Sequence, residues 1–534
     1  MKPILEVDRL TVTYEEESSP ALNDLSFTIN TGDTILLLGP SGSGKSTLTF
    51  CLNGLYPKEL DGEMSGNIFF SGSNLEDFAS GTINLEIGTV FQDPETQFCM
   101  LTVEDEIAFG LENTKMPQGK MDAEIDRVLS LVGLHHRRKD HIHTLSGGQK
   151  QKLALAAVLA LAPRLLILDE PTANLDPAAS QELAETIRRL KEQQEITLLI
   201  IEHNIDYWLP VVNRTLLLDQ DGSLFFDGDL QDGINIHAEK MQQSGIWLPE
   251  AVQLAKQAQL PRPWPLSIDL LPGGLQLHSK HTEVFQTETD IIRVDHAVFR
   301  HKGKTLLNIP DLNIQQGEFL AITGKNGSGK TLLSRLLTGL LKPAAGSVSF
   351  LGKRLSKWKA DELYQHIGYV FQNPEHQFLT DTVWSEITFG QPADEQEIKV
   401  LLDEIRLAAQ SSKHPFTLSQ GQKRRLSVAT MLVQSPQLLV LDEPTFGQDS
   451  YTTDVLMELI RKQQQRGCTI IMITHDMELV DHFARRVLVV DQGSIVSDGT
   501  PADIWDRSNL SAYGLSLPAR EVYARRNQEN VTYA

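Results

Sequence analysis

Nine residues from Gly39 to Thr47 carry the clearest chemistry in the chain. Their pattern, G-x-x-x-x-G-K-[ST], follows the apolar run Ile35–Leu38 and precedes a helical pattern, which is the strand-loop-helix setting of a phosphate-binding loop. Glycines let backbone N–H groups converge on phosphate oxygens, and the following helix directs its positive dipole end at the same anion. We expect Lys45 to contact the β- and γ-phosphates and Ser46 to bind Mg²⁺. The expected phosphate-binding residues are Gly39, Pro40, Ser41, Gly42, Ser43, Gly44, Lys45, Ser46 and Thr47.

A second phosphate-binding loop follows the apolar run Phe319–Ile322 and begins at Gly324. Two such loops in one chain make coincidence improbable, and further motifs recur in the same order after each loop. We therefore interpret the chain as a tandem duplication in which each copy is a whole domain. The second set of expected phosphate-binding residues is Gly324, Lys325, Asn326, Gly327, Ser328, Gly329, Lys330, Thr331 and Leu332.

Two adjacent carboxylates end a buried apolar strand in each copy. They are Asp169 and Glu170 in the first copy and Asp442 and Glu443 in the second. We expect each Asp to bind Mg²⁺ directly or through water, and each Glu to act as the general base on the attacking water. A single Asp-Glu pair is equally typical of a helix cap or an ion pair. Its recurrence in both copies favours catalysis.

A glutamine and a histidine complete the predicted catalytic set of each copy. Gln92 and Gln372 follow apolar strands, and we expect their amides to reach the metal and the water. His203 and His475 end a later strand, where an imidazole can contact the γ-phosphate. A lone histidine after a strand is commonly an ordinary polar terminus, so this assignment also depends on the recurrence.

A further anion site is expected at the start of a helix in each copy. A serine hydroxyl, backbone N–H groups and a helix dipole converge there, and a domain that already has one phosphate-binding loop does not need another. The sites make sense if they are shared between the copies. We call the two stretches the signature segments: Ser146, Gly147, Gly148 and Gln149 in the first copy, and Ser419, Gln420, Gly421 and Gln422 in the second.

Apolar strands alternate with helices in both copies, which predicts α/β domains with mostly parallel sheets. We expect a first domain over 1–259 and a second over 289–534, each ending in a similar helical tail, because Gly245–Pro249 resembles Gly514–Pro518. The Pro- and Gly-punctuated stretch 260–288 is interpreted as a tether.

The composition excludes several classes of protein. The net charge of −22 argues against nucleic acids and anionic lipids as partners, and the clusters Arg137–Lys139 and Lys423–Arg425 are interpreted as solvated faces or helix starts. Three distant cysteines favour neither disulfides nor zinc. The first residues lack the pattern of a secretory signal, and the longest apolar stretch, Leu153–Pro163, is too short to span a bilayer. Any membrane role is therefore expected to be peripheral.

The order of these motifs resembles the nucleotide-binding domains of ATP-binding cassette (ABC) proteins over nearly all of both copies. The resemblance implies a P-loop NTPase core with an antiparallel β subdomain and a helical subdomain. It also implies that the copies pair head to tail, so that each ATP lies between one phosphate-binding loop and the signature segment of the other copy. Adenine would stack on Tyr14 in the first copy, where His301 and Phe299 stand in the second.

Two departures from the family pattern predict unequal sites, neither of them inactive. Gln420 replaces the first glycine of the signature pair and adds a side chain where backbone should approach phosphate closely. Phe446–Asp449 differs from Ala173–Asp176, although both end in Asp.

The segments after the two glutamines resemble more specifically the ATPase subunits of energy-coupling factor importers. Fusion of two such subunits is similar to hydroxymethylpyrimidine/thiamine-type systems. This resemblance implies a membrane scaffold with coupling helices, a small membrane subunit that binds a vitamin, vitamin precursor or metal ion, and a place on the cytoplasmic face of the membrane. Phe98, Met100, Phe378 and Leu379 would line the groove for the coupling helices, or else belong to the core.

Two rival functions are weighed against the importer. A soluble tandem ABC ATPase acting on ribosomes or DNA should show a long basic linker or inserted zinc-binding cysteines, and the sequence shows neither. A fused sugar-importer ATPase commonly lacks one catalytic carboxylate, whereas Glu170 and Glu443 are both present.

Overall fold

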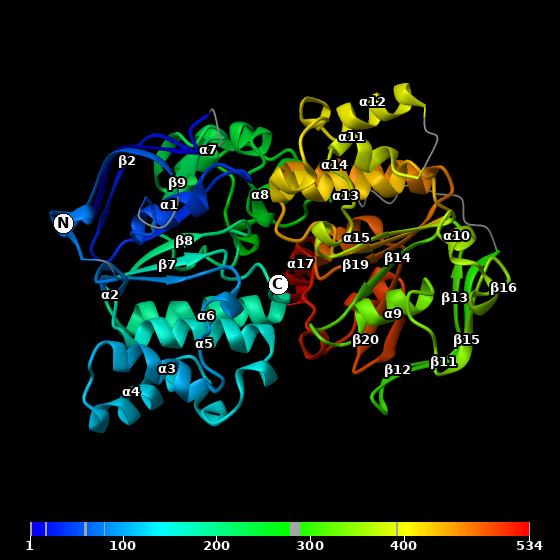
Figure 1. Cartoon of the computed structure of the whole chain (residues 1–534), viewed down its shortest axis with the longest axis horizontal. Coiled ribbons are helices and arrows are strands. Elements are labelled where there is room, and N and C mark those ends of the chain that lie inside the picture. Colours follow the sequence, from blue (N-terminus) through cyan, green and yellow to red (C-terminus); the bar gives the residue numbers. More distant parts are fainter. Residues whose placement is uncertain are drawn as a thin grey trace. The chain divides into compact units, whose positions relative to one another are not determined.

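The computed structural model describes residues 3–15, 19–57, 61–79, 81–277, 289–390 and 394–532. The chain forms two compact units, Met1–Leu271 and Pro272–Ala534. Each unit contains one six-stranded, mostly parallel sheet and one antiparallel sheet. Figure 1 labels the helices and strands of both units.

The six-stranded sheet of the first unit has the order β10-β9-β3-β8-β7-β6. All neighbours are parallel except β10, which runs antiparallel to β9. Strands β3, β7 and β8 are buried at every residue, as expected for central strands covered on both faces. The strands are β3 (Thr34–Leu38), β6 (Ile87–Val90), β7 (Leu165–Asp169), β8 (Thr197–Ile201), β9 (Arg214–Leu218) and β10 (Leu224–Gly228).

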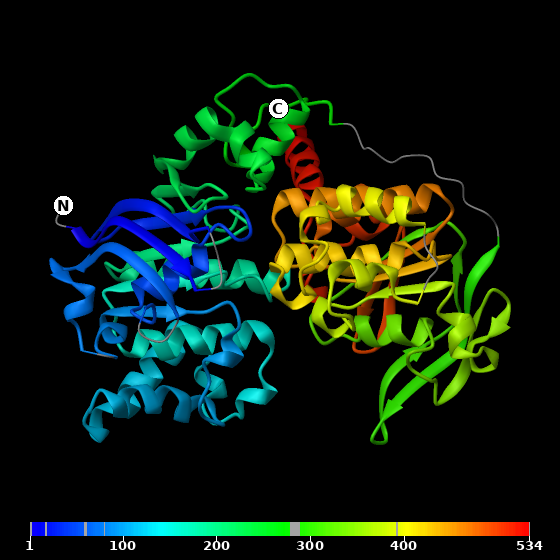
Figure 2. The same ribbon diagram turned by 45° about the horizontal axis from the view of Figure 1, so that its top comes forward.

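The second sheet of this unit is antiparallel, in the order β2-β1-β4-β5. Apolar side chains on one face of β1 and β2 join those of β3 and α1 in one core cluster, which explains the alternating pattern of these strands. Figures 1 and 2 show this sheet and helices α3 and α4 at opposite ends of the unit. The strands are β1 (Pro3–Tyr14), β2 (Leu22–Asn30), β4 (Gly62–Phe70) and β5 (Ser73–Asn74).

The helices of the first unit include a layer formed by α3 and α4, which pack on α5. The helices are α1 (Lys45–Leu52), α2 (Ile83–Glu86), α3 (Val103–Asn113), α4 (Gln118–Leu131), α5 (Gly147–Ala160), α6 (Pro177–Gln193), α7 (Leu230–Gln243) and α8 (Glu250–Gln257).

The second unit repeats both sheets. Its mostly parallel sheet has the order β17-β18-β19-β14-β20-β21, and its antiparallel sheet has the order β12-β11-β15-β16 with β13 also paired to β11. The strands are β11 (Asp290–His301), β12 (Lys304–Ile309), β13 (Leu312–Gln315), β14 (Phe319–Thr323), β15 (Ala345–Phe350), β16 (Lys353–Arg354), β17 (Ile367–Val370), β18 (Leu438–Asp442), β19 (Thr469–Ile473), β20 (Arg486–Asp491) and β21 (Ser494–Gly499).

The helices of the second unit follow the same plan, with α11 packed on α13. They are α9 (Lys330–Leu337), α10 (Ala360–Leu363), α11 (Val383–Thr388), α12 (Glu395–Glu404), α13 (Gln420–Leu432), α14 (Ser450–Gln465), α15 (Met477–Phe483), α16 (Pro501–Trp505) and α17 (Ala519–Thr532). The predicted fold class, two α/β domains each with a parallel core, an antiparallel subdomain and a helical layer, is confirmed.

The segment predicted to be a tether is partly packed. Trp264 is 7% exposed, and its indole N–H donates to the Leu260 carbonyl at 2.8 Å. Arg262 and Lys256 lie over its ring. The first compact unit therefore extends past the predicted end at residue 259, while 278–288 lies outside the described residues.

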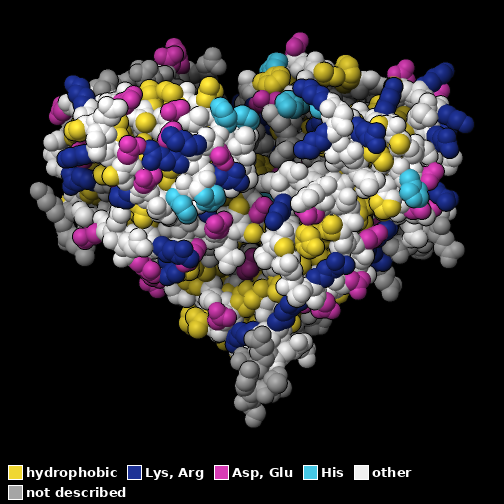
Figure 3. Space-filling model, turned by 90° about the horizontal axis from the view of Figure 1, so that it is seen from below, with side chains coloured by type: hydrophobic (Ala, Val, Ile, Leu, Met, Phe, Trp, Pro, Cys, Tyr) yellow, Lys and Arg dark blue, Asp and Glu magenta, His cyan; other side chains and the backbone are white. Residues whose placement is uncertain are grey.

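The basic cluster Lys423–Arg425 lies near the start of α13, which is one of the two predicted settings, and it is not a solvated face. Lys423 and Arg424 are 7% and 3% exposed. Arg138, from the other cluster, pairs with Glu104 and Asp126. Figure 3 shows one face of the molecule, where Lys and Arg side chains are interspersed with Asp and Glu. None of the helices within the described residues has both the length and the hydropathy to cross a bilayer.

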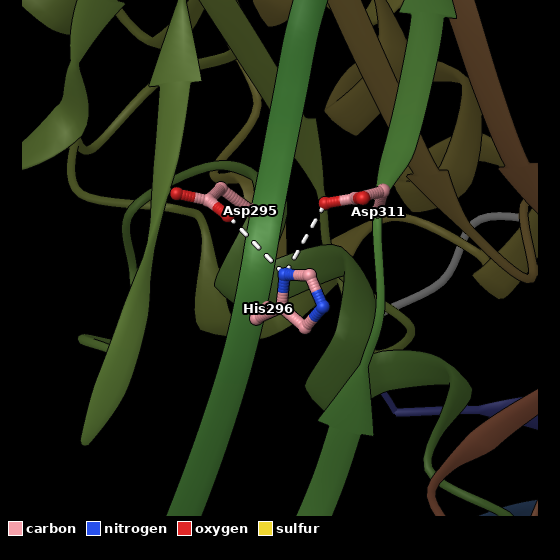
Figure 4. A group of neighbouring side chains, drawn as sticks. All are labelled: Asp295, His296 and Asp311. Carbon is pink, nitrogen blue, oxygen red and sulfur yellow. Dashed lines mark hydrogen bonds and ion pairs between the residues drawn. The ribbon is translucent and has the colours of Figure 1, made fainter.

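One exposed cluster in the second unit combines histidine with two carboxylates (Figure 4). His296 Nδ1 lies 3.2 Å from Asp295 and 3.4 Å from Asp311, and all three residues are exposed. At the matching bulge of the first unit, Arg9 lies 3.4 Å from Asp8. The cluster is therefore the counterpart of a surface ion pair.

Candidate nucleotide-binding and hydrolysis sites

The phosphate-binding loops connect a buried strand to a helix in each unit, as predicted. Gly44 has φ 84° and precedes α1, and a Cβ there would lie 2.2 Å from the Ala21 carbonyl oxygen. Gly329, with φ 108°, holds the same place before α9. These positions need glycine, because L side chains rarely adopt such φ values and the first has no room for a Cβ.

The loop lysines fold back over their own loops. Lys45 Nζ donates to the carbonyls of Gly39 and Pro40 at 2.8 and 2.9 Å. Lys330 Nζ makes the same bonds to Gly324 and Lys325 at 2.7 and 2.9 Å. Each ammonium group is thereby held at the loop, where a phosphate would be bound.

The position predicted to contact adenine is occupied by different side chains in the two units. Tyr14 lies on β1, and its hydroxyl is 2.9 Å from Thr47 Oγ1, which ties the ring to the phosphate-binding loop. In the second unit Phe299 is half-buried against the core, whereas His301 is exposed.

The predicted general bases are in an unusual backbone conformation. Glu170 and Glu443 follow β7 and β18 with φ values of 46° and 50°, in the left-handed region that side chains other than glycine seldom adopt. Their N–H groups still donate to Ile201 and Ile473 of the next strand, both at 2.9 Å. The chain therefore leaves the sheet at these residues, and such strain is typical of functional sites.

Glutamine, glutamate and histidine meet in both units. In the first unit, Glu170 accepts a bond from Gln92 Nε2 at 2.8 Å and lies 3.1 Å from His203 Nε2. In the second unit, Gln372 Nε2 donates to Glu443 at 3.2 Å.

The histidine of the second unit also lies beside its glutamate, but through the other ring nitrogen and at a longer distance. His475 Nδ1 lies 3.5 Å from Glu443. The structure therefore brings together, twice, the three residues that the sequence predicts as catalytic.

Electrostatics keep the glutamates ionised. Burial acts to raise the pKa of Glu170, but His203 and Lys45 outweigh it and lower the pKa below its ordinary value. The pKa of Glu443 is lowered against burial in the same way, by His475 and Lys330. Burial and the charge of Glu170 raise the pKa of Asp169 to about 7. An ionised carboxylate is the form that accepts a proton from water.

The donor set beside the phosphate-binding loops suits Mg²⁺. Thr331 Oγ1 lies 3.3 Å from Asp442 Oδ1, so a hydroxyl and a carboxylate oxygen are adjacent, and Mg²⁺ prefers oxygen ligands. When bound, the ion would neutralise charge on the phosphates. The residues that would hold it are Ser46, Gln92 and Asp169 in the first unit and Thr331, Gln372 and Asp442 in the second.

The signature segments begin α5 and α13. Ser146 and Gln149 form a reciprocal capping box, as do Ser419 and Gln422, so each serine caps its own helix. A Cβ added at Gly147 would meet only ordinary contacts, the nearest being the Asn174 carbonyl oxygen at 3.6 Å. Nothing in its own unit therefore requires glycine at this position.

The second glycine of each signature pair is confined by its own unit. A Cβ at Gly148 would lie 3.0 Å from the Cβ of Ala179 on α6. At Gly421 the nearest atom would be Gln448 Oε1 at 3.2 Å. Gln420, at the position of Gly147, is exposed.

Two polar residues at the sites were not predicted. Glu202 is 3% exposed and accepts bonds from the N–H groups of Thr172 and His203, both at 3.0 Å, and from the Thr172 hydroxyl. Thr474 replaces it in the second unit. There the Tyr369 hydroxyl contacts Asp442 at 3.4 Å and Ser334 at 2.9 Å. The Glu-His and Thr-His pairs were visible in the sequence, but their contacts were not.

The two units define a class of protein. The family model described as "ABC transporter" matches residues 22–173 and again 307–446. The chain belongs to this family of ATP-binding subunits, whose domains are ATP hydrolases.

Similar proteins match nearly the whole chain. A Bacillus subtilis (strain 168) protein named "Putative HMP/thiamine import ATP-binding protein YkoD" is 43% identical over 96% of this chain and 95% of its own. A Methanosarcina acetivorans protein named "Putative ABC transporter ATP-binding protein" is 36% identical over 97% of this chain and 90% of its own. A solved complex of archaeal ribosomal stalk protein aP1 with the ribosome recycling factor aABCE1 matches with a TM-score of 0.60 and 20% identity, over 92% of this chain and 90% of that chain. The last likeness shows the fold alone.

Proposed function

We propose that the chain is the ATP-hydrolysing subunit of an energy-coupling factor type importer, located at the cytoplasmic face of the cell membrane. Its ATP turnover would drive uptake of a vitamin, a vitamin precursor or a metal ion through partner membrane subunits. The observation that carries the proposal is the 43% identity, over 96% of the chain, to a protein named for HMP/thiamine import.

Two composite ATP sites are part of this proposal. The first site would combine Lys45, Ser46, Gln92, Asp169, Glu170 and His203 with Ser419, Gly421 and Gln422. The second would combine Lys330, Thr331, Gln372, Asp442, Glu443 and His475 with Ser146, Gly147, Gly148 and Gln149. The room around Gly147 supports this pairing, because its glycine is not needed by its own unit. Closure on ATP would move the attached membrane subunit, provided that ATP binds the closed state more tightly.

The loop that follows each glutamine exposes an apolar side chain to solvent. The buried carboxylate of Glu106 accepts bonds from Cys99 and Met100 N–H at 2.9 and 2.8 Å, and Leu101, just beyond, is 76% exposed.

Glu386 binds Leu379 and Thr380 N–H in the same way, at 3.0 and 2.8 Å, and Leu379 is 72% exposed. Exposed apolar side chains fixed by a rigid loop suit a helix that docks in a groove. Phe378, predicted to line the groove or to belong to the core, is 7% exposed and belongs to the core.

A pull-down from detergent-solubilised membranes tests the importer. We expect the native chain to retain a multi-spanning membrane protein, and Leu101→Asp with Leu379→Asp to lose it. Ile236→Asp is the matched control, because Ile236 is 64% exposed on α7 and belongs to neither loop, and it should bind normally. Retention of ribosomes in place of a membrane protein would instead support a soluble tandem ATPase.

A further inference from the structure

The backbone after β6 and β17 is held differently in the two units. We call Phe91–Gln97 and Phe371–Gln377 the Gln loops. In the first unit Asn174, from the segment after Glu170, donates through Nδ2 to the Gln92 carbonyl at 3.0 Å. Gln151 on α5 donates to the Phe91 carbonyl at the longer distance of 3.3 Å.

In the second unit one arginine on α13 makes both contacts. Arg424 Nη1 donates to the Phe371 carbonyl at 2.8 Å, and Nη2 donates to the Gln372 carbonyl at 2.5 Å. Arg424 stands where the first unit has Gln151, and Gly447, which has no side chain to donate, stands where the first unit has Asn174. The same carbonyl is therefore bound from two different elements.

Gln97 and Gln377, at matching positions, also bind different parts of their units. The Gln97 side chain accepts from Phe91 N–H at 2.9 Å and donates to the Thr89 carbonyl at 3.0 Å, so its contacts stay within the loop and the strand before it. Gln377 instead donates to Ser427 and Thr430 of α13 at 2.7 and 2.6 Å.

A salt bridge from the helix to the loop is common to both units. It joins Lys150 to Glu95 in the first and Lys423 to Glu375, at 2.6 Å, in the second. The glutamine, arginine and asparagine contacts, in contrast, differ between the units.

The Arg424 contacts are strong because they are buried and charged. Arg424 is 3% exposed. An arginine guanidinium in a protein carries a positive charge and has no acceptor, so it can only donate to the two carbonyls. Hydrogen bonds from an ionised donor are stronger than neutral ones, and a bound guanidinium presents a rigid fork to the two carbonyls.

We propose that Arg424 and Asn174 are positioning residues that hold the carbonyls of Gln372 and Gln92 to different elements. Arg424 ties the second loop to the signature helix α13, and Asn174 ties the first loop to the segment Ala173–Asp176. The reach of Gln372 to Glu443 then follows movements of α13, whereas the reach of Gln92 to Glu170 follows that segment. The catalytic consequence rests on the role proposed above for the glutamines, but the mechanical link does not.

Hydrogen exchange of the whole chain without nucleotide tests the mechanical link. Arg424→Gln, which copies the first unit, should speed exchange of the second Gln loop roughly tenfold, as expected for loss of a charge-assisted hydrogen bond. Exchange of the first Gln loop should not change. Asn174→Ala should speed exchange of the first Gln loop and leave exchange of the second unchanged. Arg425→Gln is the matched control, because Arg425 contacts Ile405 and Thr452 and neither Gln loop.

Placing an arginine in the first unit, at the position that matches Arg424, distinguishes a positioning role from a general loss of structure. Gln151→Arg added to Asn174→Ala should restore slow exchange in the first Gln loop, and Arg424→Lys should restore the second only partly, because lysine lacks the fork. ATP turnover of Arg424→Gln should show a larger change in kcat than in KM for ATP, since Gln372 contacts Glu443 while Lys330 and the phosphate-binding loop are unaltered. Unchanged exchange in Arg424→Gln, or equal acceleration by Arg425→Gln, would overturn the proposal whether or not the chain serves an importer.

Discussion

The first glycine of the signature pair gives the sharpest test of whether a residue is kept for the fold or for the ligand. Gly147 and Gly148 are adjacent and helical, so alanine gains the same helix propensity at both, up to about 1 kcal/mol. Their surroundings differ. A Cβ at Gly147 has its nearest neighbour at 3.6 Å, whereas one at Gly148 meets the Cβ of Ala179 at 3.0 Å.

These contacts set the expected magnitudes. Carbon atoms attract best near 3.5–4.0 Å, so Gly147→Ala should leave the free energy of unfolding unchanged or slightly higher. Gly148→Ala overpacks the contact between α5 and α6 and should be less stable than Gly147→Ala by about 1–3 kcal/mol. Denaturant unfolding of the two variants, measured side by side, gives this difference.

A longer side chain at position 147 should weaken ATP binding without lowering the free energy of unfolding. Gly147→Gln copies Gln420 and should fold normally, yet weaken apparent ATP affinity by roughly tenfold, the equivalent of about one lost hydrogen bond. ATP titration of turnover measures this. If Gly147→Gln unfolds as readily as Gly148→Ala, or binds ATP as tightly as the native chain, the reasoning about a ligand-facing glycine is refuted.

Further variants at four glutamates test other parts of the account. Glu170→Gln and Glu443→Gln, made separately, should each keep ATP binding and reduce turnover by roughly 10²–10⁴-fold at the altered site; equal losses of total turnover would contradict unequal sites. Glu202→Ala leaves the Thr172 N–H, the Thr172 hydroxyl and the His203 N–H without their acceptor and should lower the free energy of unfolding by about 1–3 kcal/mol or more. Glu202→Gln should lower it less, and denaturant titration measures both. Hydrogen bonds from Arg188 and Arg189 hold the pKa of Glu185 at about 2, below its ordinary 4.5, so its stabilisation is complete above pH 4.5 and fades as pH falls toward 2. Between pH 5 and 3 the free energy of unfolding of Glu185→Gln should fall less than that of the native chain. An equal fall in both would argue against a stabilising contact of Glu185 with these arginines.

The parts that could be predicted from sequence are those set by local pattern. A buried apolar run that ends in Gly-rich sequence or in Asp-Glu specifies a strand and the loop at its carboxyl end, and its repetition indicates both units and both catalytic sets. Glu170 and Glu443 lie beside the predicted glutamine and histidine because parallel strands end at the same edge of a sheet.

The parts that could not be predicted depend on distant contacts. The burial of Lys423 and Arg424 could not be predicted, because it depends on contacts such as those of Arg424 with the carbonyls of Phe371 and Gln372. Trp264 belongs to a Pro-rich stretch that is typical of a tether, yet it is 7% exposed, and Lys256 and Arg262 lie over its ring. The burial of Phe378 is likewise set by the packing of its loop and not by its neighbours in sequence.

The most direct test counts nucleotides. The double variant Glu170→Gln, Glu443→Gln, incubated with Mg²⁺ and ATP and then freed of excess nucleotide, should retain two ATP molecules per chain, because both phosphate-binding loops are intact and neither site can hydrolyse. One ATP per chain, or none, would contradict the claim that the two copies together form two complete ATP sites.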